Sequence, residues 1–138
     1  MNFFSQMLSD LRTLQSICRE LLALAERESQ SLRSGQTESM GEASQARKGL
    51  LPQLNDTLAK VRQHRVLWQS LTVAERSAQP EIAHLVRQTQ ELIMRVILLD
   101  RDNEQGLLRR GWIPAREIPS AQRQRPHFVA DLYRRQQA

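Results

Sequence analysis

Several residue types are scarce in this 138-residue sequence, and each scarcity narrows the choice of fold. Aromatic residues make up 4% of the chain, and glycine and proline occur five times each. Such a composition disfavours β-sandwiches and barrels. The single cysteine, Cys18, has no partner for a disulfide within the chain.

Long hydrophobic runs are also missing. Residues 92–99 form the most apolar stretch, but Arg95 interrupts it, and a spanning helix needs about 20 apolar residues. We therefore expect no membrane span. The first residues, MNFFSQMLSDLR, lack the basic start and continuous apolar core of a signal peptide. This leads us to expect a cytoplasmic protein.

The net charge of +5 is unevenly distributed along the chain. Basic and acidic side chains balance at thirteen each in residues 1–108, whereas residues 109–138 carry seven arginines against Glu117 and Asp131. The second segment also holds three prolines. We divide the chain accordingly into a helical bundle, residues 1–108, and a basic, Pro/Arg-rich flexible tail, residues 109–138, with a candidate short helix near its end.

Leucine, arginine, glutamine, glutamate and alanine dominate the remainder and favour helices. In the first run, apolar or small residues recur every three or four positions, which is a heptad pattern: Phe4, Met7, Leu11, Leu14, Cys18, Leu21, Ala25 and Leu32. The pattern predicts a helix over residues 3–33, ended by Gly35. The second run is weaker because it contains Gly41, Gly49 and Pro52. We expect a break or kink at 49–52 and a dependable helix over 50–70.

Pro80 suits the first turn of a third helix. Its core stripe is Ile82, Leu85, Leu92, Val96 and Leu99, broadened by Val86, Ile93, Ile97 and Leu98. This helix should be the most buried of the three and should end at Gly106 and Gly111. The sequence thus predicts an all-α fold, an antiparallel three-helix bundle with coiled-coil-like packing and an extended C-terminal tail.

Residues for catalysis are few and scattered. The three histidines, His64, His84 and His127, lie on different elements, and neither His64 nor His84 has a second histidine or carboxylate at the i+4 spacing of a helical metal pair. Cys18 occupies a core position, and no Gly-rich phosphate loop is present. We therefore expect no enzyme, cofactor, metal site or small-molecule substrate.

Two features of the tail leave alternatives open. Its arginines could bind phosphate, but no recognisable nucleic-acid module accompanies them, so nucleic acid has little support as a partner. Trp112 and Tyr133 either fold back on the bundle or await a partner.

Three segments together resemble the FlgN family of flagellar export chaperones. They are LLALAERESQSLRSG in the first helix, SQARKGLLPQL in the second region and RDNEQGLL at the end of the third helix. In the family the last place carries an asparagine, a glycine and a leucine pair, matched here by Asn103, Gly106, Leu107 and Leu108.

The resemblance implies a cytoplasmic chaperone for type III flagellar export. Such a protein binds the C-terminal helices of hook-associated (hook–filament junction) proteins, prevents their premature assembly and delivers them for secretion. It also implies that Tyr133 contacts a component of the export gate. For partner binding we expect eight residues of the third helix: Leu92, Ile93, Val96, Ile97, Leu99, Asn103, Leu107 and Leu108.

A rival interpretation comes from another functional class. The heptad pattern also suits a self-associating coiled-coil structural or regulatory protein, with its basic tail contacting nucleic acid or a membrane. The sequence does not choose between a monomer and a homodimer.

Overall fold

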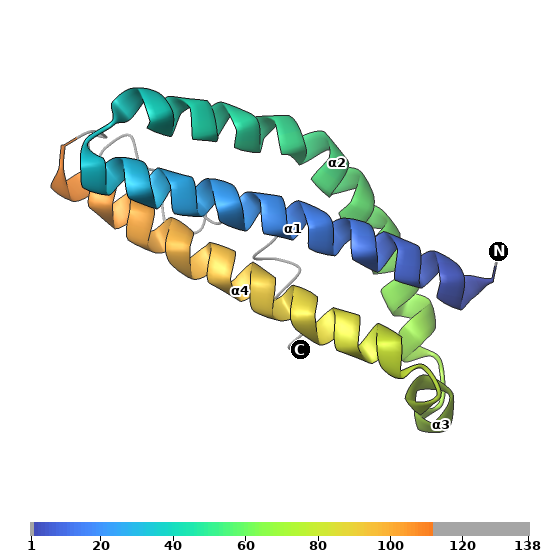
Figure 1. Ribbon diagram of the computed structural model, residues 1–138. Helices are drawn as coiled ribbons and strands as arrows, with labels where there is room; N and C mark the ends of the chain where they lie inside the picture. Colours follow the sequence, from blue (N-terminus) through green and yellow to red (C-terminus); the bar gives the residue numbers. More distant parts are fainter. Residues whose placement is uncertain (1, 112–138) are drawn as a thin grey trace.

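The computed structural model describes residues 2–111 and contains three long helices and one short one (Figure 1). They are α1 (Phe3–Ser34), α2 (Thr37–Gln69), α3 (Val73–Ser77) and α4 (Pro80–Arg109). α1 and α4 run in one direction and α2 in the other, so the long helices form an antiparallel bundle. The predicted all-α bundle is confirmed. Trp112, His127, Tyr133 and nearly all of the tail lie outside the described residues.

Local capping explains where the first and last long helices begin and end. The Asn2 Oδ1 atom accepts a hydrogen bond of 2.8 Å from the Ser5 backbone N–H, which caps α1. Gly35, with φ of 73°, ends α1 in the left-handed conformation that glycine adopts without strain. Pro80 opens α4, as expected, because the first turn needs no N–H donor there.

Two expected helix boundaries are wrong in part, because Gly106 does not end α4, although Gly111 follows its end, and α2 has no break at residues 49–52. α4 continues through Gly106 to Arg109 and is followed by Gly111, with φ of 67°. A single glycine costs a helix only about 1 kcal/mol, and Gly106 is buried. α2 likewise passes through Pro52 without a break, although its ribbon bends along its length (Figure 1). The buried residues Leu54, Leu58 and Val61 hold the helix in the core beyond the proline.

α1 is the central helix, with α2 against one side and α4 against the other. The hydrophobic core is one cluster that all three helices supply, and it includes Leu14, Leu58 and Ile93. Cys18 is 1% exposed within this cluster, as its position in the heptad pattern predicted. Among residues 2–111, no helix is long and apolar enough to cross a membrane.

Candidate functional site

The residues that the sequence marked for partner binding occupy two sides of α4. Leu92, Leu99 and Asn103 follow one another at helical spacing on the side towards α1. There the Asn103 side chain donates a 3.0 Å hydrogen bond to the Ala25 carbonyl of α1. A Cβ added to Gly106 on the same side would lie 3.2 Å from Leu32 Cδ1. Asn103 and Gly106 therefore let α4 approach α1 closely.

Ile93, Ile97, Asp100, Glu104 and Leu108 form the second side, which we name the α2-facing strip. Their spacing of four, three, four and four residues places them along one line of the helix. Asp100 fixes the direction of this line, because its carboxylate contacts Arg47 of α2. Val96 and Leu107 lie between the two sides.

The structure buries half of the eight predicted residues. Ile93, Val96, Ile97 and Asn103 are at most 6% exposed. Leu92, Leu99 and Leu107 are half-buried, and Leu108 is 40% exposed. With the helices packed in this way, a partner would reach Leu108 directly but Ile93 and Ile97 only after the helices separated.

Arg47 joins all three long helices through a cluster of ion pairs. Its Nη1 and Nη2 atoms each donate a 2.7 Å hydrogen bond to the Asp100 carboxylate of α4, and Nη1 lies 3.0 Å from Glu28 Oε1 of α1. The bidentate geometry is the one in which arginine and a carboxylate interact most strongly. We call Arg47 with Glu28 and Asp100 the Arg47 clasp.

Burial governs the protonation of the groups around the clasp. It raises the pKa of Glu28, although the neighbouring Arg47 acts in the opposite direction. Burial also raises the pKa of Glu104, and the negative charge of Asp100 adds to that increase. For Arg47, burial alone would lower the pKa, but the hydrogen bonds and charges of Asp100 and Glu28 outweigh it and raise the pKa.

The three segments on which the family resemblance was based meet at this cluster. Glu28 and Leu32 come from the first segment, Arg47 from the second, and Asn103 and Gly106 from the third. The sequence gave no sign that Arg47 of the second segment contacts Glu28 of the first and Asp100, which directly precedes the third. Its partners lie on other helices, so no i, i+4 spacing marks them.

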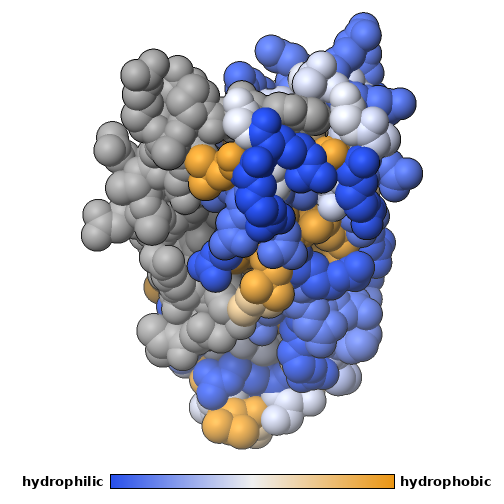
Figure 2. All heavy atoms as spheres, turned by 90° about the vertical axis from the view of Figure 1, so that its left-hand side faces the viewer, coloured by the Kyte–Doolittle hydropathy of each residue, from blue (hydrophilic) through white to orange (hydrophobic). Residues whose placement is uncertain are grey.

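Other apolar side chains on the surface are dispersed. Large exposed examples are Val66, Leu67, Val73 and Leu98. Figure 2, which views the end of the bundle where α2 begins, shows apolar groups separated by hydrophilic ones. Scattered single residues of this kind are normal on a soluble surface.

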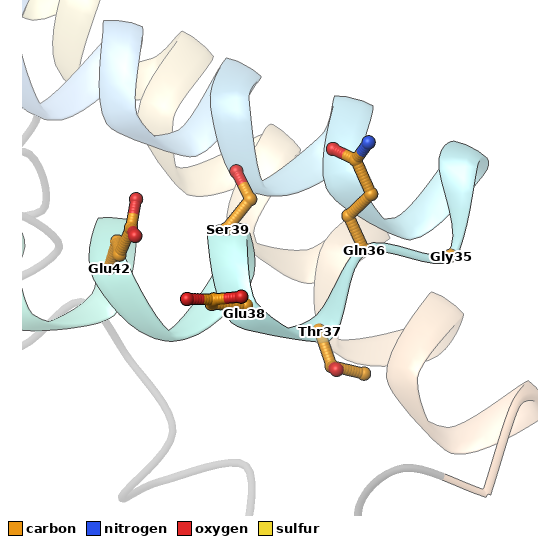
Figure 3. Close-up of a pocket in the computed structure, with 6 residues that line it drawn as sticks. All are labelled: Gly35, Gln36, Thr37, Glu38, Ser39 and Glu42. Carbon is orange, nitrogen blue, oxygen red and sulfur yellow. The ribbon is translucent and has the colours of Figure 1, made fainter.

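A shallow pocket at the turn between α1 and α2 is polar. It is lined by Gly35, Gln36, Thr37, Glu38, Ser39 and Glu42 (Figure 3). Its side chains offer two carboxylates, two hydroxyls and an amide, and no basic or apolar group. The pocket is formed by the turn and the first turns of α2 alone, without residues of α4.

The candidate catalytic residues occupy separate environments. His64 Nε2 lies 2.7 Å from Asp10 Oδ2 of α1, a pairing between helices that the sequence did not reveal. His84 is exposed on α4. Burial raises the pKa of the Cys18 thiol to about 12. Within residues 2–111, no three His, Cys, Asp or Glu side chains are arranged to hold a metal ion.

Comparisons with protein-family models, with curated proteins and with solved structures find no match to this chain.

Proposed function

We propose that this protein is a FlgN-type flagellar export chaperone that holds an amphipathic C-terminal helix of hook-associated proteins before their secretion. The observation that carries the proposal is the placement of the three family-like segments at one end of the bundle, where Arg47 contacts Glu28 and Asn103 contacts Ala25. The first two segments flank the turn between α1 and α2, and Asn103 and Gly106 of the third lie against the first. This placement supports treating the three segments as one unit.

The proposed mechanism is stoichiometric binding. A helix that presents apolar residues at i, i+3, i+4 and i+7 docks along another apolar helix face, which hides the residues through which it would otherwise polymerise. On α4, Leu108 offers an exposed apolar contact, and the half-buried Leu107 lies beside it. Release at the export machinery then frees the partner helix for assembly.

The decisive experiment mixes the purified protein with purified hook-associated proteins. Size-exclusion chromatography should show a one-to-one complex. Leu108→Glu should weaken this complex about tenfold or more, because a buried, unpaired charge at an interface is costly. The matched control is Leu98→Glu, since Leu98 is also exposed on α4 but lies off the α2-facing strip.

Neither substitution should alter the helical circular dichroism, since both leucines reach the surface. A charge at Ile93 would be a poor probe, because that side chain is fully buried and the bundle would unfold. Absence of a complex with every hook-associated protein would refute the chaperone proposal. If Leu108→Glu and Leu98→Glu weaken the complex equally, the partner does not bind at the end of α4.

A further inference from the structure

The first half of α2 contributes fewer buried residues to the bundle than the second. Of the five buried residues of α2, only Ala43 lies within residues 37–51. The helix begins at Gln36 without a side-chain cap, and the polar pocket lies against its first turns (Figure 3). We call residues 37–51 the arm.

Gly49 and Pro52 mark the end of the arm and supply a hinge. Proline removes one backbone hydrogen bond from a helix interior, and glycine has the lowest helix propensity after proline. A Cβ at Gly49 would meet nothing within 4 Å, so Gly49 itself makes no close contact, although Leu50 and Leu51 pack against the core. Beyond it, Leu54, Leu58 and Val61 anchor the rest of α2 in the core.

Polar contacts add to the packing of Ala43, Leu50 and Leu51 in fixing the arm. The Arg27–Glu42 pair is about half exposed on both sides, and such surface pairs contribute little. The Arg47 clasp is different, because Glu28 and Asp100 are at most 11% exposed. Removing one member of such a cluster leaves buried charge without compensation.

Arg47 of the arm reaches the part of α4 that was predicted to bind the partner, because its guanidinium contacts Asp100. Since α2 and α4 are antiparallel, the arm runs opposite the last turns of α4. Moving the arm outward would withdraw Arg47 from Asp100, which lies one turn beyond the buried Ile97 on the α2-facing strip. It would also leave three carboxylates, those of Glu28, Asp100 and Glu104, without the guanidinium that now neutralises them.

We propose that the arm swings away at Gly49–Pro52 and that the partner's amphipathic helix takes its place on the α2-facing strip. The three carboxylates define the chemistry of this partner. Its helix carries an arginine or lysine beside its apolar stripe, in the position that Arg47 occupies in the closed bundle. The partner half of this inference rests on the proposed chaperone function, whereas the arm's opening does not.

Opening of the arm is testable without a partner. Ser31 is 2% exposed and lies one helical turn beyond Arg27 and Glu28 of α1. Both of these residues contact the arm. Ser31→Cys therefore introduces a thiol of nearly the same size on the side of α1 that faces the arm. Cys18, buried in the central core, reports global unfolding in the same molecule. Under native conditions, a maleimide followed by mass spectrometry should label the introduced thiol faster than Cys18, because the arm opens as a separate local unit.

Two further substitutions in the Ser31→Cys protein separate local from global opening. Arg47→Met should speed labelling of the introduced thiol about tenfold or more. The clasp exists only when the arm is closed, so its loss destabilises the closed state and raises the fraction of open molecules. Ile82→Val, at the far end of α4, should speed labelling of Cys18 alone, since Ile82 stays packed when the arm opens. If Ile82→Val speeds labelling of both thiols equally, the arm does not open separately from the rest of the bundle and the proposal fails.

The partner's use of the opening needs a second measurement. Arg47→Met should tighten binding of the co-eluting hook-associated protein about tenfold, because the cost of opening is removed. Arg12→Met breaks an exposed ion pair with Glu81 and should leave affinity unchanged. If Arg47→Met weakens the complex instead, the docking inference fails while the chaperone proposal stands. If no hook-associated protein binds, the chaperone proposal and the partner docking fail, and only the thiol experiment still applies.

Discussion

Gly106 should be the one glycine of the helices whose replacement by alanine fails to stabilise the protein. Alanine is favoured over glycine in a helix interior by about 1 kcal/mol. A Cβ at Gly41 or Gly49 meets open space, so Gly41→Ala and Gly49→Ala should each gain up to that amount. At Gly106 the new Cβ would lie 3.2 Å from Leu32 Cδ1, and Leu32 is only 5% exposed.

The contact with Leu32 decides the sign of the effect. A Cβ at 3.2 Å requires Leu32 to move by a few tenths of an ångström within a packed core, and overpacking costs roughly 1–3 kcal/mol. Set against the gain of about 1 kcal/mol from helix propensity, Gly106→Ala should range from neutral to about 2 kcal/mol destabilising.

Urea unfolding followed by circular dichroism measures each variant. A double-mutant cycle supplies the sharper test, because Leu32→Ala removes the atom that the new Cβ meets. In that background Gly106→Ala should stabilise as Gly41→Ala does, which gives a coupling energy of about 1–3 kcal/mol. If Gly106→Ala in the otherwise unchanged protein stabilises as much as Gly41→Ala, the close approach of α4 to α1 is not as described.

Two further predictions concern polar groups near the clasp. Asn103→Ala should lower the free energy of unfolding by about 1–3 kcal/mol, because it removes the buried hydrogen bond to the Ala25 carbonyl. Asn55→Ala, at an exposed position of α2, is the control and should leave the free energy of unfolding unchanged. Equal urea midpoints for the two variants would contradict a structural role for Asn103. Burial raises the pKa of Glu104 in the folded protein above its ordinary value of 4.5. At a pH between the unfolded-state and folded-state pKa of this group, folding is therefore accompanied by proton uptake. The contribution of Glu104 to stability therefore falls as pH rises through that window. Glu104→Gln should accordingly stabilise the protein at pH 7 and have no effect below pH 4.5 in urea titrations, and a pH-independent effect would rule out this origin.

Features set by local sequence could be predicted, and those set by pairing between helices could not. The heptad pattern from Phe4 to Leu32 and the proline at position 80 located α1 and the start of α4 within a residue or two. Of the break or kink expected at Gly49–Pro52, the break does not occur, because core contacts beyond Pro52 outweigh a local preference. The Arg47 clasp could not be predicted because Arg47 is separated from its two partners by 19 and 53 residues.

The candidate site shows the same division. A broad apolar stripe predicts that several sides of a helix are covered, but not by what. The sequence interpretation assigned the surplus on α4 to a partner, whereas in the structure α4 packs mainly against α1, and Arg47 of α2 reaches its other side. The two accounts are compatible if Arg47 and the first half of α2 give way where the partner binds, since that half lies opposite the last turns of α4.

Stability and binding should therefore oppose each other at the hinge. Gly49→Ala favours the straight helix at the hinge by about 1 kcal/mol, and if the arm must bend there to admit a partner, affinity should fall roughly fivefold. Gly41→Ala is the matched control, since it strengthens the arm as a helix but leaves the hinge alone. Isothermal titration calorimetry with the hook-associated protein, alongside urea unfolding, separates the two effects. If Gly49→Ala stabilises the bundle and leaves affinity unchanged, the partner binds without moving the arm.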